Sequence, residues 1–333
     1  MGSLKKYLLW PSVLILLILI EFGIFGTFSS RFLNISNLLY SIGDFLYIAI
    51  AALPMTLIIA SGAIDISIGA IMGLGSILTG LVWVKTGNIQ LAFFAGLAGG
   101  AVSGFINGSL ILMTQVNSLV ITLGSSFLFS GLALTLSGLA GSTGFEGIGG
   151  FPDSFVNIAN GEVLGLPNPV IILLGLIILF YFILHHTKFG RYLFLIGMSP
   201  EGARYSGIPT ARVVVITYVI SGIIAAFAGI MLASYFTSAR SDLGADAPLT
   251  VITCTVLGGA SIYGGTGSII GTTLASLLIG YLKYGLQMIK ITSHQTNVFL
   301  GIVLIVSISG RYFWEQISSR HKNKMALKHE ELL

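Results

Sequence analysis

Long apolar runs, separated by short polar segments, repeat along the whole chain. Several of these runs reach the roughly 20 residues that an α-helix needs to cross the hydrocarbon core of a bilayer. The pattern predicts ten membrane spans, near residues 8–28, 44–60, 66–84, 91–113, 116–137, 169–186, 213–236, 249–263, 267–289 and 296–312. The first run is too long for the core of a secretion signal and has no clear cleavage site of small residues, so we expect a retained helix.

Composition supports an all-α polytopic membrane protein. Of the 333 residues, 55% are hydrophobic and only 8% are charged, and the mean hydropathy is +0.96. These values leave no soluble domain of useful size, so residues 1–333 are expected to form one transmembrane domain. The 43 glycines favour close helix packing in lipid. The single Cys254 lies in an apolar run and offers neither a disulfide nor a metal site.

The basic residues are distributed unevenly among the polar segments. On one predicted side lie 11 of the 16 Lys and Arg residues, namely Lys5, Lys6, Lys188, Arg191, Arg204, Arg212, Arg311, Arg320, Lys322, Lys324 and Lys328. The 138–168 loop on the other side has acidic residues but no Lys or Arg. By the positive-inside rule, we expect both termini, the 187–212 loop and the 313–333 tail in the cytoplasm, and the 138–168 loop outside.

The polar segment from Thr187 to Arg212 predicts a short exposed helix. Ser199 can cap a helix that begins at Pro200, and a glutamate in its first turn favours the helix dipole. Gly207 and the proline two residues later are expected to end this helix after about two turns. Such a helix is a candidate docking site for a cytoplasmic partner, and a plain solvated connector is the alternative.

Two stretches, 54–73 and 248–271, share an unusual pattern. Each starts with Pro, continues as an apolar run, meets a Gly/Ser-rich break and resumes with a similar pentamer, GAIMG or GSIIG. Such breaks in corresponding halves indicate an internal repeat and a transport path, because non-helical backbone at membrane depth must be shielded by protein or face water. Gly264 and Gly267 in the second break are candidate path or gating positions. Two ordinary Gly-rich turns at the membrane edge are the alternative.

Polar side chains in or between the spans are further candidates for the path. Asp65 and Ser67 lie in the first break, where an acidic group is functional or paired by default. Asp65 can also act structurally, by accepting backbone N–H groups at the start of the following helix. Asn107 and Asn117 are candidates too, although hydrogen bonding between helices is the commoner role for such residues.

Two outer loops contain features beyond simple connection. In the 238–246 loop, Ser238 and Asp242 can contact a small polar solute at a cavity mouth. A solvated loop with an Arg240–Asp242 ion pair is the alternative. The second segment, 142–152, has several glycines and two Phe residues, which predict a compact ordered loop.

The chain contains none of the enzyme motifs that we sought. It has no Walker A sequence, no H-E-x-x-H and no G-x-S-x-G, and the GGTG at 264–267 is too short for a phosphate loop. We therefore expect a transporter that is driven by an ion gradient or by a separate subunit. An ion-driven transporter needs buried ionisable groups, for which only Glu21, Asp44 and Asp65 are plausible. A facilitator channel would not need the capped helix that begins at Pro200.

Four collinear segments resemble the membrane subunits of bacterial ABC sugar importers, the ribose-type permeases. They are SGAIDISIGAIMG, VNSLVITLG, TKFGRYLFLIGMSPEGARYSGI and VLGGASIYGGTGSIIGT, and the resemblance extends over nearly the whole chain. Within this family, STGFEGIGGFP and YFTSARSDLGA are similar to segments of the permeases of autoinducer-2 import systems. The resemblance thus implies autoinducer-2 as the substrate, with ribose or another small sugar as the alternative.

The resemblance also implies a ten-helix permease of the bacterial inner membrane that works by alternating access. Its implied partners are a second, related permease, two copies of a cytoplasmic ATPase and a periplasmic binding protein. This chain would be non-catalytic, because the ATPase would bind ATP and Mg. The residues implied in ATPase coupling are Arg191, Ser199, Glu201, Ala203, Arg204 and Gly207. Pro200-Glu201-Gly202 departs from the acidic or small residues of many ribose-type members, which leaves the docking geometry open.

Overall fold

The computed structural model describes residues 2–29, 31–142 and 146–292, together with isolated residues between 295 and 305. The described chain is mostly helical, with one short hairpin of the strands β1 (Glu162–Val163) and β2 (Leu166–Pro167). The helices are α1 (Gly2–Phe28), α2 (Ile35–Tyr40), α3 (Ile42–Ala60), α4 (Ile68–Thr86), α5 (Ile89–Thr114), α6 (Ser118–Leu139), α7 (Asp153–Asn160), α8 (Asn168–His186), α9 (Lys188–Met198), α10 (Pro200–Tyr205), α11 (Thr210–Tyr235), α12 (Ala247–Leu257) and α13 (Ile269–Met288).

Eight helices within the described residues are long and apolar enough to cross a membrane. They are α1, α3, α4, α5, α6, α8, α11 and α13. Each of them coincides with one of the predicted spans, so the polytopic all-α fold is confirmed. The predicted tenth span, 296–312, lies largely outside the described residues.

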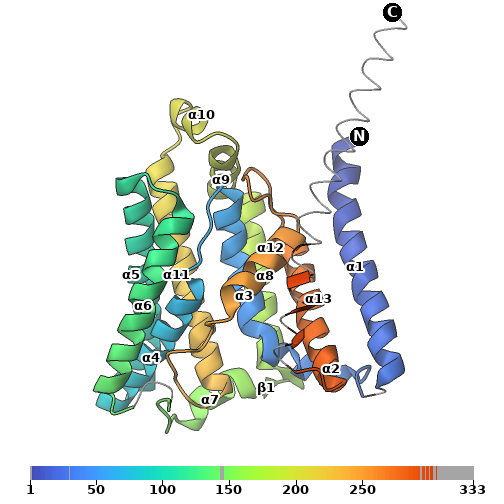
Figure 1. Cartoon of the computed structure of the whole chain (residues 1–333), viewed down its shortest axis with the longest axis vertical. Coiled ribbons are helices and arrows are strands. Elements are labelled where there is room, and N and C mark those ends of the chain that lie inside the picture. Colours follow the sequence, from blue (N-terminus) through green and yellow to red (C-terminus); the bar gives the residue numbers. More distant parts are fainter. Residues whose placement is uncertain are drawn as a thin grey trace, which may run out of the picture.

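The span predicted at 249–263 is wrong. The helix there, α12, has only 11 residues, which at 1.5 Å per residue gives about 16 Å, roughly half the hydrocarbon thickness. It ends before Gly258 and Gly259, and the chain between 236 and 246 is non-helical. This non-helical segment rises into the bundle from the lower end of α11, and α12 continues upward from it (Figure 1). The segment and α12 together cross the bundle once, as the predicted span would have done. The sides of the membrane predicted for the later loops are therefore unchanged.

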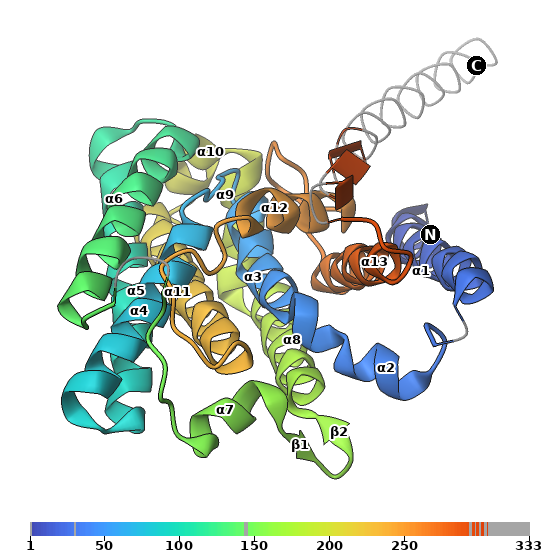
Figure 2. The same cartoon turned by 60° about the horizontal axis from the view of Figure 1, so that its bottom comes forward.

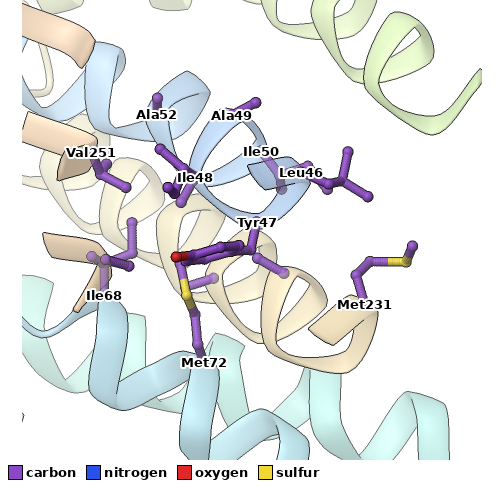
Figure 3. Close-up of a cluster of buried hydrophobic side chains, with 14 of the residues drawn as sticks. Leu46, Tyr47, Ile48, Ala49, Ile50, Ala52, Ile68, Met72, Met231 and Val251 are labelled. Atoms are coloured by element: carbon purple, nitrogen blue, oxygen red, sulfur yellow. The ribbon is translucent and has the colours of Figure 1, made fainter. Parts of the chain in front are cut away.

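Helix α3 forms the centre of the bundle. Nearly all of its side chains are buried, which agrees with its apolar character on all faces. It packs against α8, α11, α12 and α13. Figure 3 shows part of the surrounding core, where Tyr47 and Ile48 of α3 meet Ile68 and Met72 of α4 and Val251 of α12.

Small residues allow the closest helix contacts, whereas aromatic residues attach the peripheral helix α1. Gly100 of α5 and Gly222 of α11 face each other so closely that a Cβ on either would collide with the carbonyl oxygen of the other. Helix α1 lies at the edge of the bundle beside α13 (Figure 2). There the ring of Phe22 meets Tyr281 edge-on, with centroids 5.1 Å apart.

The two ends of the bundle differ in charge. Helices α9 and α10 and the start of α1 lie at one end, which is the upper end in Figure 1, whereas α7 and the hairpin lie at the lower end. The four basic residues of the Thr187–Arg212 segment are therefore at the upper end, and Asp153 and Glu162 are at the lower end. The N-terminal helix start and the 187–212 loop share one end, as the distribution of charges predicted.

The loop at 142–152 is compact in its described part, which excludes 143–145. Phe151 stacks on Phe155 of α7, with ring centroids 4.5 Å apart. Ile148 pairs with Ala239 through two backbone hydrogen bonds of 2.8 and 2.9 Å. The two outer loops singled out from the sequence therefore contact each other at the lower end.

Candidate functional site: the broken helices and the upper helix pair

Both stretches with the shared pattern have a helix–break–helix structure. In the first stretch, α3 is followed by non-helical residues 61–67, the upper break, and then by α4. In the second, α12 is followed by a loop at 258–268, the α12–α13 loop, and then by α13. The upper break descends from the top of α3 into the bundle before α4 begins (Figure 1). This placement argues against an ordinary turn at the membrane edge.

The two breaks meet at the upper end of the bundle. The backbone N–H of Gly265 donates a hydrogen bond of 2.9 Å to the carbonyl oxygen of Ala60. Gly62 and Gly264 have φ angles of 84° and 85°, which glycine adopts without strain. Gly197 of α9 packs between them, and a Cβ at this position would collide with Ala60 and Gly265. We call Gly62, Gly197 and Gly264 the glycine junction; it brings the backbone of α9 against both breaks.

Helix α9 leads directly into the short helix predicted from the sequence. The Ser199 hydroxyl caps α10 by accepting a hydrogen bond of 3.1 Å from the N–H of Gly202. The helix begins at Pro200 and ends at Tyr205, before Gly207, so the predicted bounds are confirmed. Arg204 lies in its last turn, where a positive charge complements the helix dipole.

One of the residues implied in ATPase coupling does not lie on the outer face of α9 and α10. Arg191, Glu201 and Arg204 are exposed, together with Gly207. The side chain of Ala203 is only 5% exposed and belongs to the cluster of buried apolar residues that includes Leu193, Ile196 and Ile208. Ala203 therefore holds α10 on the bundle and does not lie on its outer face, contrary to the expectation of an ATPase contact. The sequence reasoning overlooked Tyr205, which is 91% exposed.

Asp65 is the centre of a buried hydrogen-bond network. Its Oδ1 accepts from the backbone N–H of Ser67 at 2.9 Å and from the Ser67 hydroxyl at 2.6 Å. The predicted hydrogen bond from Ser67 N–H is therefore present, but Ser67 is itself the N-cap residue of α4, so Asp65 closes the turn before the helix and does not cap it. The Ser67 hydroxyl accepts from Nδ2 of Asn107 at 2.8 Å, and the Ser221 hydroxyl donates to Oδ2 of Asp65 at 3.4 Å. All four side chains are buried. The network joins three of the predicted path residues and attaches the upper break to α5 and α11.

Side chains from α6 and α11 form hydrogen bonds with the backbone of the upper break, and the α11 contact is the Tyr218 hydroxyl, which donates to the carbonyl oxygen of Ile64 at 3.4 Å. Ile64 N–H donates to the Ser118 hydroxyl and Ile66 N–H to the Thr122 hydroxyl, both at 3.1 Å. Asn117 is exposed and caps its own helix by accepting from Leu119 N–H, so the predicted helix-to-helix bond is made by its neighbour Ser118. Ser118 and Thr122 are polar residues spaced four apart in the apolar span of α6, and this spacing is the signal in the sequence that could have identified their contact with the upper break.

The segment 236–246, which we call the lower segment, enters the bundle from the opposite end. Its backbone at Ser241 and Gly244 lies so close to Gly73 and Gly69 of α4 that neither glycine has room for a Cβ. Helices α4 and α12 thus both begin inside the bundle, next to each other. The sequence analysis predicted a loop outside the membrane here and did not predict that the segment enters the bundle.

The three charged or polar side chains predicted in this loop have local partners. Arg240 and Asp242 form the expected ion pair, with Nε donating to Oδ1 at 2.9 Å. Ser238 packs against Gly147 of the other outer loop. The backbone N–H of Arg240 donates to the Ser76 hydroxyl of α4 at 3.2 Å. These contacts fix the lower segment against α4 and the neighbouring loop.

This arrangement is typical of transporters. Two non-helical segments enter from opposite ends, and each leads to a helix that begins inside the bundle, where its free N–H groups and nearby polar side chains can contact a solute. Gly264 and Gly267 lie at the upper end, in the α12–α13 loop, and Asp65, Ser67 and Asn107 lie in the interior. The predicted path residues therefore form an interior group, a group at the upper end and a pair in the lower segment, Ser238 and Asp242, with Asn117 apart from all three.

Comparison with known proteins agrees with this geometry. Two curated proteins called autoinducer 2 import system permease protein LsrD, from Yersinia enterocolitica and Yersinia pseudotuberculosis, are each 49% identical over 302 residues, or 91% of both chains. The protein of the same name from Escherichia coli K12 is also 49% identical, over 91% of this chain and 92% of its own length. No solved structure matches. Residues 37–308 match the family described as branched-chain amino acid transport system / permease component, so the chain belongs to this family of multi-span membrane permeases.

Proposed function

We propose that this chain is a membrane-spanning subunit of an ATP-driven importer that carries autoinducer-2 across the bacterial inner membrane. The observation that carries the proposal is the 49% identity, over 91% of the chain, to curated permeases of autoinducer-2 import. Ribose or another small sugar is the second candidate, since the sequence motifs are shared by ribose-type permeases. The similarity to import permeases disfavours an ion-driven transporter.

The proposed assembly contains a second, related permease, two copies of a cytoplasmic ATPase and a periplasmic binding protein. ATP and Mg would be bound by the ATPase, and this chain would be non-catalytic. The basic upper end supports an orientation in which the termini and α10 lie in the cytoplasm. In this orientation, the compact loops at the lower end face the periplasm, where the binding protein delivers its ligand.

The proposed mechanism is alternating access. When ATP closes the ATPase dimer, α10 moves with the surface on which it is docked, and α9 moves with it. The glycine junction supports this coupling, because α9 backbone at Gly197 contacts both breaks. A shift of α9 therefore displaces the upper break and the α12–α13 loop together, and the helices that follow them reorient the path.

A weakly binding path suits this ligand. Autoinducer-2 in its unborated form is small, neutral and rich in hydroxyl groups, so hydrogen bonds rather than ion pairs are needed. The binding protein supplies the affinity, and we expect no high-affinity site in this chain. The hydroxyl groups and amides of the broken segments can serve as transient partners for such a solute.

The test is ATP hydrolysis by the reconstituted complex of both permeases, the ATPase and the binding protein. We expect hydrolysis to be stimulated by autoinducer-2 on the binding protein and not by ribose. Stimulation by ribose alone would support the importer function but identify ribose as the substrate. A permease pair that neither copurifies with an ATPase nor couples to one would contradict the proposal.

A further inference from the structure

Asp246 occupies an unusual position for a charged residue. It is the last residue of the lower segment, directly before α12, which begins well above the lower ends of α11 and α13 (Figure 1). Its side chain is nevertheless 61% exposed. An ionised carboxylate in contact with lipid hydrocarbon is strongly disfavoured. The face of α12 and α13 that carries Asp246 therefore lies against water or another polar surface, and not against lipid tails.

Two polar side chains from other helices approach the same carboxylate oxygen. The Nζ of Lys283 on α13 lies 3.9 Å from Oδ2 of Asp246, and the Tyr47 hydroxyl on α3 donates to this oxygen at 3.3 Å. Lys283 lies within a membrane-spanning helix and its side chain is 18% exposed. Three separate elements thus place one carboxylate, one ammonium and one phenol around a single point.

The geometry leaves much of the hydrogen-bonding capacity of these groups unused. A distance of 3.9 Å is too long for a hydrogen bond between ammonium and carboxylate, which is usually 2.7–2.9 Å. An ammonium has three donors and a carboxylate about four acceptor positions. By contrast, Arg240 and Asp242 in the same segment are in close contact through two nitrogen–oxygen pairs and satisfy each other. The looser pair has free hydrogen-bonding positions on both groups, and at 3.9 Å a hydroxyl oxygen placed beside the pair can lie within hydrogen-bonding distance of both.

We propose that Asp246, Lys283 and Tyr47 form a contact point for hydroxyl groups of the transported ligand in the lower half of the path. A ligand hydroxyl would donate to the carboxylate of Asp246 and accept from the ammonium of Lys283. This set suits a neutral, hydroxyl-rich solute, because the two charges cancel and both hydrogen-bond polarities are offered. The inference rests on the proposed importer function and adds the residues that meet the ligand on the periplasmic side.

The first test is accessibility of this face to water. In a Cys254→Ser background, an Asp246→Cys variant of the full complex in membrane vesicles is treated with a charged, membrane-impermeant thiol reagent added on the periplasmic side. Leu249→Cys, at a position 68% exposed three residues further along α12, gives the same test without disturbing the ion pair. The control is Ile178→Cys at the middle of α8, a position that is 69% exposed and expected to face lipid. We expect both the Asp246→Cys and the Leu249→Cys variants to react about tenfold faster, or more, than the control.

The second test separates ligand contact from a purely structural ion pair. Asp246→Asn and Lys283→Gln are each expected to reduce autoinducer-2 uptake about tenfold, the effect of losing one hydrogen bond to a charged group. The double variant Asp246→Lys with Lys283→Asp keeps the pair but reverses its position, and we expect it to remain defective. Wild-type uptake by this double variant, or thiol labelling no faster than for Ile178→Cys, would overturn the proposal. Uptake of ribose instead of autoinducer-2 by the unmodified complex would contradict only the substrate, since the labelling result is independent of it.

Discussion

The glycine junction makes a sharp prediction for Gly264→Ala. A Cβ at this position would lie 2.6 Å from the carbonyl oxygen of Gly197, 2.8 Å from its Cα and 2.9 Å from the Cα of Gly62. All three atoms are backbone, so no side chain can rotate away. Because ordinary contact begins at 3.4 Å, α9 and the upper break must separate from the α12–α13 loop by 0.5 to 0.8 Å, from the differences 3.4 − 2.9 and 3.4 − 2.6.

Two costs contribute, and a neighbouring residue separates them. Gly264 has φ 85°, and alanine in this region is strained by about 1–3 kcal/mol. Overpacking adds about 1–3 kcal/mol. Gly265→Ala is the matched control, because Gly265 has φ 77° and its Cβ would approach only the flexible side chain of Met198 closely, with backbone atoms at 3.6 Å. The strain is common to both variants, whereas the backbone overlap belongs to Gly264→Ala.

The measurement is ligand-stimulated ATP hydrolysis and uptake by the reconstituted complex, together with the thermal unfolding midpoint of each variant. We expect Gly264→Ala to reduce coupled uptake about tenfold further than Gly265→Ala does, since 1.4 kcal/mol corresponds to a factor of ten. We also expect it to have the lower midpoint of the two. Equal losses in both variants would show that strain alone matters, and would refute the idea that contact between α9 and the two breaks couples the complex.

Three other substitutions test separate parts of the argument. Glu201→Lys on the exposed face of α10 should leave the protein in the membrane but uncouple ATP hydrolysis from uptake, and normal uptake would contradict docking through this helix. Gly267→Leu should block assembly or transport, because even a Cβ there would lie 3.2 Å from Thr56. Wild-type transport by this variant would show that the stretch is an ordinary loop. Asp65→Asn weakens the acceptor for the two Ser67 hydrogen bonds and should lower stability by about 1 kcal/mol, which an unchanged unfolding midpoint would disprove.

Features set by local chemistry could be predicted from the sequence. A membrane requires a minimum helix length, so apolar runs identified α1, α3 and the six other long helices. A serine before a proline and a glycine a few residues later define a short capped helix wherever it lies, and α10 has these bounds. The hydrogen bond from Ser67 N–H to Asp65 joins residues only two positions apart, and it too was predictable, although it closes the turn before α4 and does not cap the helix.

Features set by contacts between distant segments could not be predicted in this way. The run at 249–263 is apolar enough for a span, and its composition does not show that only the 11 residues of α12 are helical. The lower segment is polar, so it resembled a solvated loop; only the contacts of Gly69 and Gly73 with its backbone reveal that it lies inside the bundle. Lys283 is a charged residue within an apolar run, and its partner Asp246 lies 37 positions earlier in the chain, so the sequence does not show that the two residues are close.

Helix α12 connects the two places where we expect function. Its C-terminal end leads into the loop that contains Gly264, and its N-terminal end follows Asp246, so about 16 Å of rigid helix separates the junction from the proposed ligand contact. The Thr255 hydroxyl, 3.4 Å from the carbonyl oxygen of Ala52, ties the C-terminal part of α12 to the central α3. Because Thr255 lies only two residues before the end of this 11-residue helix, a tilt about this contact moves the N-terminal end of α12 further than its C-terminal end. We therefore expect a displacement of α9 at the glycine junction to be transmitted along α12 and to change the position of Asp246 relative to Lys283 and Tyr47, so that one motion affects both ends of the path.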